Sequence, residues 1–211
     1  MKSKSLSKLQ IKRLLMAFIG VALSGICVGI FNTALLGADP FTVFVTGSGN
    51  LFGLSYGNIY TIVTGVFLLA VFLLDRHYIG IATIFNLFGI GYIAQFTMYL
   101  IELVYQGGGS IPLRLGMFLF GLLLLCFGSS LYFVADLGVS AYDAIALILA
   151  KRTSIPFRFC RIGTDTLCVI IGFSLQAVIG IGTLITAFFM GPIIQWFVDH
   201  FAKPFLEKSH H

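Results

Sequence analysis

The sequence predicts an all-α polytopic membrane protein built from two internal repeats, and three observations lead to this prediction. First, 58% of the 211 residues are hydrophobic and only 10% are charged, whereas a soluble domain carries about 25% charged residues. Second, apolar runs of about twenty residues, the length of a transmembrane helix, follow one another along the chain, without the alternation of a membrane β-barrel. Third, residues 79–96 and 179–196 are identical at eight of eighteen positions.

The repeat extends beyond this pair of segments. Residues 13–42 align with residues 114–143 at an offset of 101, and the first pair aligns at an offset of 100. Internal duplication of this kind is a recurrent plan of membrane transporters. We expect a basic cytoplasmic N-terminus at 1–12, repeat one at 13–105, a linker loop at 106–112, repeat two at 113–201, and a cytoplasmic C-terminus at 202–211 that ends in a tag-like "SHH".

Each repeat is predicted to contain a long helix, a glycine break, a short helix and two further long helices. Basic residues precede the first long helix, and Lys and Arg gather on the cytoplasmic side of membrane proteins, so the N-terminus is predicted to be cytoplasmic. Gly37 and Gly138 allow the chain to turn after the first long helix of each repeat. The predicted helices span 13–35, 39–50, 57–74 and 79–105 in repeat one, and 113–134, 140–151, 158–177 and 180–201 in repeat two.

The two short segments carry residues typical of helix starts. Asp39 can cap the first, with Pro40 at its first helical position, and Ser140 with Asp143 can form a capping box for the second. Twelve helical residues reach less than about 20 Å, too short for a hydrocarbon core of about 30 Å.

We therefore expect each short helix to enter the membrane and return, which leaves three crossings per repeat. Six crossings place the two repeats in inverted orientations. The alternative is eight spans with parallel repeats, and the charge pattern does not separate the two arrangements: the exception to the positive-inside rule is Arg114 in the first and Arg76 in the second.

One helix face repeats in the two copies. Gly80, Thr83, Gly91 and Gln95 share a face, and Gly180, Thr183, Gly191 and Gln195 form the matching face. Small residues allow close helix packing in lipid, so this face is interpreted as a packing seam. The alternative is that it lines a solute path in which Thr183 and the two Gln residues contact the solute.

The charges of the predicted helix 158–177 form a stronger candidate site. Arg161 and Asp165 share a face, and Asp165 lies about 10 Å beyond the cytoplasmic end of that helix. An ionisable side chain at such depth indicates a functional site by default, although a purely structural ion pair between the two is the alternative. Asp143 stands where the first repeat has Thr42, so the copies differ in charge at this position. Asp39, Ser140 and Asp143 are candidates for solute binding as well as helix capping.

Other chemistries find no support in the sequence. It shows no serine–histidine pair, metal-ligand cluster or phosphate-binding loop, so we expect no enzymatic activity, no cofactor and no metal. The positive net charge is concentrated at the N-terminal flank, which argues against nucleic acid as a partner.

The stretches "LGVSAYDA" (137–144) and "GIGTLITAFFMGPIIQWF" (180–197) resemble the YczE/YitT-like family of bacterial inner-membrane proteins. Ala141 and Tyr142 depart from the proline and tryptophan usual in the first of these motifs. Members of this family are largely uncharacterised and are presumed to be transporters. The resemblance implies a multi-pass protein of the bacterial inner membrane.

These inferences lead to one functional prediction and two alternatives. We expect a transporter or permease for a small polar or cationic solute, with its site between the repeats near the starts of the short helices. One alternative is a membrane substrate-binding subunit of a multi-component uptake system, and the other is a membrane accessory protein without transport. The expected partners are a small-molecule solute and the lipid bilayer, with a second copy of the chain or another membrane subunit as further candidates.

Overall fold

The computed structural model describes residues 8–105 and 110–207, all of whose regular elements are helical, which confirms the all-α prediction. The basic residues Lys2 and Lys4, the linker residues 106–109 and the final "SHH" lie outside the described residues. The elements are α1 (Lys8–Ala34), α2 (Pro40–Phe52), α3 (Tyr56–Asp75), a 3₁₀ turn η1 (Arg76–Tyr78), α4 (Ile81–Val104), α5 (Ile111–Ala135), α6 (Ala141–Thr153), α7 (Phe157–Ser174), α8 (Ile181–Phe197), a π-helical turn η2 (Val198–Ala202) and α9 (Lys203–Glu207).

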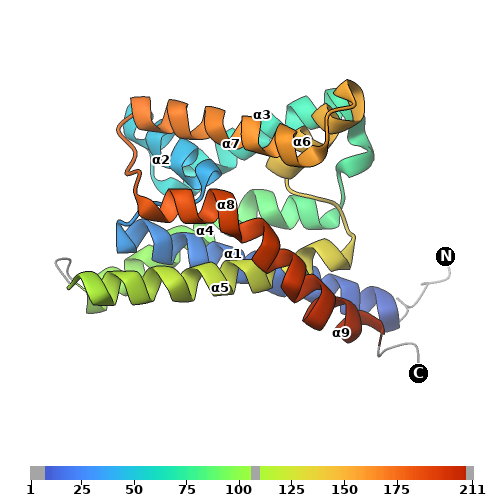
Figure 1. Ribbon diagram of the computed structural model, residues 1–211, viewed down its shortest axis with the longest axis horizontal. Coiled ribbons are helices and arrows are strands. Elements are labelled where there is room, and N and C mark those ends of the chain that lie inside the picture. Colours follow the sequence, from blue (N-terminus) through green and yellow to red (C-terminus); the bar gives the residue numbers. More distant parts are fainter. Residues whose placement is uncertain (1–7, 106–109, 208–211) are drawn as a thin grey trace, which may run out of the picture.

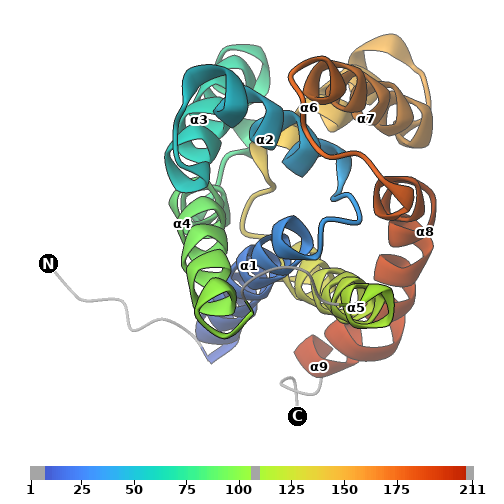
Figure 2. The same cartoon turned by 90° about the vertical axis from the view of Figure 1, so that its left-hand side faces the viewer.

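The long helices lie roughly along one axis and surround the centre of the molecule (Figures 1 and 2). Helices α1 and α5 pack against each other on one side. Helices α3 and α7 lie on the opposite side with the short helices α2 and α6, while α4 and α8 flank the two sides between them (Figure 2). Helices α1 and α5 run in opposite directions, as do α3 and α7, and α4 and α8 (Figure 1).

The short helices α2 and α6 have 13 residues each and begin near the middle of the molecule. From there they run toward opposite ends. The far end of α2 is bound to the end of α7, where Asn50 Nδ2 donates to the Gln176 carbonyl at 3.1 Å. The far end of α6 is bound to the end of α3, where Lys151 Nζ pairs with Asp75 Oδ2 at 2.9 Å. At about 1.5 Å per residue each helix is about 20 Å long, too short to cross a membrane alone.

The break before each short helix is held by the repeated motif of the other half of the chain. The Leu36 carbonyl accepts from Gly182 N at 2.8 Å, and the Leu137 carbonyl accepts from Ala82 N at 3.0 Å. The two breaks use left-handed glycines, Gly37 at φ 94° and Gly138 at φ 106°, a conformation that other residues adopt only with strain. The start of α8 thus supports the start of α2, and the start of α4 supports that of α6.

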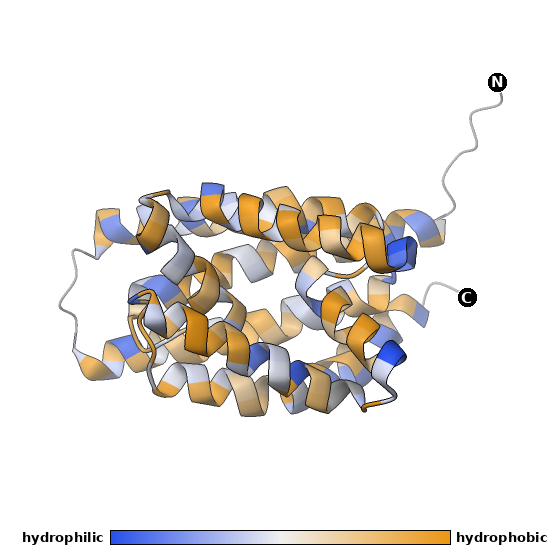
Figure 3. Cartoon of the chain, turned by 90° about the horizontal axis from the view of Figure 1, so that it is seen from above, coloured by the Kyte–Doolittle hydropathy of each residue, from blue (hydrophilic) through white to orange (hydrophobic). Residues whose placement is uncertain are grey.

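The outer surface is apolar. Large hydrophobic side chains such as Leu73, Val104 and Phe173 are more than two-thirds exposed, which is rare in contiguous patches on soluble proteins. Hydrophobic residues dominate along the long helices in Figure 3. Within residues 8–105 and 110–207, five segments are long and apolar enough to cross a membrane: Leu9–Ala34, Tyr56–Tyr78, Ile81–Val104, Ile111–Ala135 and Ile181–Glu207. Helix α7 is not among them, because its 18 residues include three charged ones, Arg158, Arg161 and Asp165.

Candidate functional site: a charged cluster in a central cavity

The starts of both short helices line a cavity of about 1100 Å³. The cavity extends from the middle of the molecule to the last turns of α8 and the beginning of α9. Most of its wall is apolar or aromatic. Its charged lining residues are Asp39, Asp143, Arg161, Asp165 and Lys203.

Three of these charges form one cluster between α6 and α7. The Arg161 guanidinium is paired with Asp143, and its Nε lies 3.1 Å from Asp165 Oδ1. The Tyr142 hydroxyl donates to the Asp165 carboxylate. Asp165 is only 9% exposed, so its charge is stabilised by these two partners instead of by water. The sequence left two interpretations of Arg161 and Asp165, a structural ion pair and a functional site. The structure is compatible with both, because the two residues are paired and also line the cavity.

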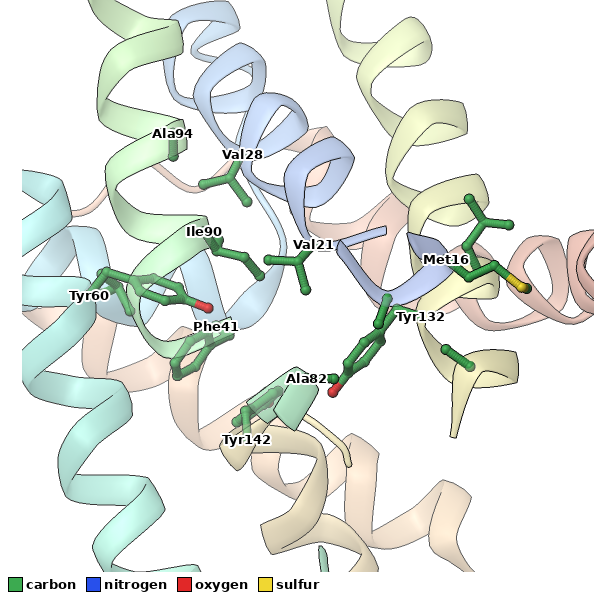
Figure 4. Close-up of a cluster of buried hydrophobic side chains, with 14 of the residues drawn as sticks. Met16, Val21, Val28, Phe41, Tyr60, Ala82, Ile90, Ala94, Tyr132 and Tyr142 are labelled. Carbon is green, nitrogen blue, oxygen red and sulfur yellow. The ribbon is translucent and has the colours of Figure 1, made fainter. Parts of the chain in front are cut away.

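Aromatic rings surround this cluster. The Arg161 guanidinium lies 4.5 Å from the centre of the Tyr142 ring, and the Phe41 ring stacks on the same ring at 4.7 Å between centroids. Two groups this close to one ring must occupy its opposite faces, so Tyr142 lies between them. The Phe41 ring also contacts the Tyr60 ring edge to face, with 5.8 Å between the centroids. Figure 4 shows these two side chains next to each other. Both faces of Tyr142 are thus covered, but Tyr60 and Tyr132 also line the cavity, and aromatic faces attract cations.

The short-helix starts place further oxygen atoms at the cavity. Asp39 caps α2 by accepting from Thr42 N at 3.2 Å, while its Oδ2 atom is buried without a hydrogen-bond partner among the described residues. Ser140 caps α6 by accepting from Asp143 N at 3.0 Å and donates to Asp143 Oδ2 at 2.7 Å. The predicted capping residues are confirmed, and both caps also line the cavity.

The structure brings together most of the predicted site residues. The cavity is lined by Asp39, Ser140, Asp143, Arg161, Asp165 and Gln195. Gln95 is not in its lining, and its Oε1 accepts from Gly57 N at 3.0 Å, so it joins α4 to α3. Thr183 is 2% exposed and lies beside Gly37 at the break before α2, away from the cavity lining. For these two residues the structure favours the packing interpretation.

The sequence analysis did not single out three aromatic and amide residues of the site. Tyr142 completes the charged cluster, and Tyr60 OH donates to Asn86 Oδ1 at 3.1 Å on the cavity wall. Asn86 could have been identified from the sequence, because an amide within a predicted membrane span requires a hydrogen-bond partner. Phe41 and Tyr142 occupy equivalent positions of the two repeats, but the alignment alone did not indicate that they touch.

Comparison with known proteins gives a family without an assigned function. The chain belongs to the family of unknown function DUF6198, which matches residues 11–199. It is 24% identical over 199 residues to the uncharacterized protein YyaS of Bacillus subtilis, covering 90% of this chain and 94% of that protein. It is 25% identical over 162 residues to the uncharacterized membrane protein YczE of the same organism, covering 76% and 73%. No solved structure matches the chain.

The resemblance to YczE predicted from the two sequence motifs is confirmed by this match. Together with the five apolar helices of sufficient length, it identifies the chain as an integral, multi-pass membrane protein.

Proposed function

We propose that this member of the DUF6198 family is a transporter of the bacterial inner membrane that carries a small organic cation through a site between two inverted repeats. Both termini would lie in the cytoplasm, as the basic N-terminal flank predicts. The six long helices would each cross the membrane, with α7 as the sixth. Two of its charged residues, Arg161 and Asp165, line the cavity, where a charge does not face lipid.

The observation that carries the proposal is the position of the charged cluster. It lies where two half-length helices begin, in the middle of the molecule and inside a cavity. Transporters built from inverted repeats place their substrate sites at the starts of such discontinuous helices, at mid-depth in the membrane. The opposite directions of α1 and α5, of α3 and α7 and of α4 and α8 support the inverted arrangement.

The charge balance supports a cationic solute. Three carboxylates and two basic groups line the cavity, which leaves one negative charge when all are ionised. The two aspartates of the cluster share Arg161, while Asp39 Oδ2 has no described partner. A buried carboxylate oxygen is costly unless a donor or a positive charge approaches it. An alkylammonium or guanidinium group supplies both and can lie against the aromatic rings.

The test compares Asp39→Asn with Asp75→Asn in purified protein. Asparagine is also a good helix cap, so the first change removes the cavity charge and keeps the start of α2. Asp75 is a matched control because it caps η1 and pairs with Lys151 at the end of the molecule, outside the cavity lining.

We expect methylguanidinium to raise the melting temperature of wild type and of Asp75→Asn, and to be taken up by proteoliposomes that contain either protein. Asp39→Asn should lose both effects. Equal stabilisation by neutral methylurea, or uptake that Asp39→Asn leaves unchanged, would refute a cation site. Binding without uptake in wild type would favour a substrate-binding subunit.

A further inference from the structure

The two halves of the molecule differ in how their last two helices pack. Helix α3 packs along α4, whereas α7 and α8 do not pack along each other in the described part of the chain. The α3–α4 seam consists of Gly57, Tyr60, Asn86, Gly91 and Gln95. In it, Gln95 accepts from Gly57 N, Tyr60 donates to Asn86, and a Cβ on Gly91 would come within 2.8 Å of Tyr60 Cβ.

The equivalent positions of the second half can be assigned residue by residue. Helices α2 and α6 have equal lengths, and each is followed by a left-handed residue, Gly53 and Ser154. The offset of 101 therefore continues to the starts of α3 and α7, while α4 and α8 follow the offset of 100. The counterparts of the α3–α4 seam are positions 158, 161, 186, 191 and 195.

The three counterparts on α8 do not contact α7 in this way: in the described part of the chain, Gln195 and Thr186 bond within their own helix and Gly191 has open space beside it. Gln195 Nε2 donates to Asp199 Oδ2 at 2.8 Å on its own helix. Thr186 Oγ1 donates to the Thr183 carbonyl at 3.0 Å, also within α8. A Cβ on Gly191 would meet nothing within 4 Å among the described residues. A glycine lowers the stability of a helix interior, and no neighbour in this arrangement requires one at this position.

Helix α8 also contains features that allow it to bend, which α4 lacks. Pro192 lies inside α8, where it removes a backbone hydrogen bond. The π-helical turn Val198–Ala202 follows six residues later, and such turns are common sites of bending. Helix α4 has Tyr92 at the position of Pro192 and is α-helical from Ile81 to Val104.

We infer that α8 closes onto α7 through the same contacts that hold α4 on α3, with Gly191 receiving the side chain of Arg161 and Gln195 binding the backbone N–H at position 158. The described arrangement is then the state in which the cavity is open beside α8 and closed beside α3 and α4. Lys203 lines the cavity at the open end, and α9 contacts the beginning of α1 through Lys12 and Phe205. The opening therefore lies at the end that holds both termini. This inference rests on the proposed transport by inverted repeats and assigns Gly191 and Gln195 to its closing step.

The first test measures closure directly, without any solute. In a background with the four cysteines replaced by serine, Arg158→Cys with Gln195→Cys is treated in membranes with a short bis-maleimide. The positive control is Asn58→Cys with Tyr92→Cys between α3 and α4, whose wild-type side chains are hydrogen-bonded at 3.2 Å. Both pairs should cross-link. A control pair that links while the 158/195 pair never does would overturn the inference and leave the proposed transport standing.

The second test blocks closure. Gly191→Leu fits the described arrangement, because nothing lies within 4 Å of its Cβ in the described residues, but it would collide with Arg161 after closure. We expect a melting temperature no lower than that of wild type, loss of the 158/195 cross-link, and loss of methylguanidinium uptake. Gly116→Leu, whose Cβ also meets no described atom within 4 Å, should likewise not lower the melting temperature and should leave the cross-link and the uptake unchanged.

The readouts separate the two levels of the proposal. A Gly191→Leu protein that still cross-links as wild type does contradicts closure through this contact. If the 158/195 pair cross-links with Gly191 in place, but the wild-type protein transports no cation, the proposed function is contradicted and closure is supported.

Discussion

Replacing Arg161 by glutamine should destabilise the protein more than any single change to its two partners. Arg161 is shared by Asp143 and Asp165, and its side chain is 23% exposed against 15% and 13% for theirs. Arg161→Gln leaves two carboxylates without their cation. Removing one member of a buried pair costs about 3–5 kcal/mol, because the remaining charge is still desolvated. Since all three side chains are partly exposed, we expect a cost near the lower end, about 3 kcal/mol.

Asp165→Asn should cost less. The asparagine oxygen can still accept from Tyr142, and Arg161 keeps its pairing with Asp143. The expected loss is about 1.5–2 kcal/mol, the lower part of the range for a hydrogen bond to a charged group. The triple variant Asp143→Asn, Arg161→Gln and Asp165→Asn carries no charge in the cluster, so its stability should return to within about 1 kcal/mol of wild type.

The assay is unfolding in mixed micelles with increasing dodecyl sulfate, followed by far-ultraviolet circular dichroism. The three single variants at Asp143, Arg161 and Asp165, the double variants that combine them and the triple variant form a closed cycle. The coupling energy between these residues is obtained from the differences in their free energies of unfolding. The reasoning is wrong if Arg161→Gln costs no more than Asp165→Asn, or if the triple variant is as unstable as Arg161→Gln alone. Either result would mean that water, and not the guanidinium, stabilises the two carboxylates.

Three further predictions concern topology and packing. A thiol introduced at Ser110, which is exposed, should react with an impermeant reagent added outside the cell under six spans, and labelling only after lysis would establish eight. Gly37→Ala should cost about 1–3 kcal/mol, because the φ of Gly37 is 94° and the start of α8 lies against this residue. Gly116→Ala, in an open part of α5, should not destabilise the protein, and equal losses in the two variants would contradict the explanation from backbone strain. Tyr60→Phe should cost about 1 kcal/mol by leaving Asn86 unpaired, and a neutral result in the same micelle assay would mean that cavity water replaces the hydroxyl.

Local chemistry made much of the fold predictable from the chain alone. The predicted break between 35 and 39 and the observed start of α2 at Pro40 agree because a capping aspartate, a proline and a preceding glycine act within a few residues of each other. The same holds for Ser140 and the start of α6. The choice of Arg161 and Asp165 as candidates followed from the cost of charges in an apolar helix, which can be judged without knowing their neighbours. The choice of Asp143 followed from its difference in charge from Thr42 at the equivalent position of the first repeat.

The tertiary structure decided what the repeated motif does and which of its residues lie at the cavity. Gly80 and Gly180 carry the same motif, but each holds the break of the other half, a contact between residues more than fifty positions apart that no periodicity encodes. The sequence treats Gln95 and Gln195 as equivalent, yet one joins α4 to α3 and the other lines the cavity. An amide in an apolar helix must find a partner, and which partner it finds depends on the distance between whole helices, a property of the packed molecule and not of the local chain.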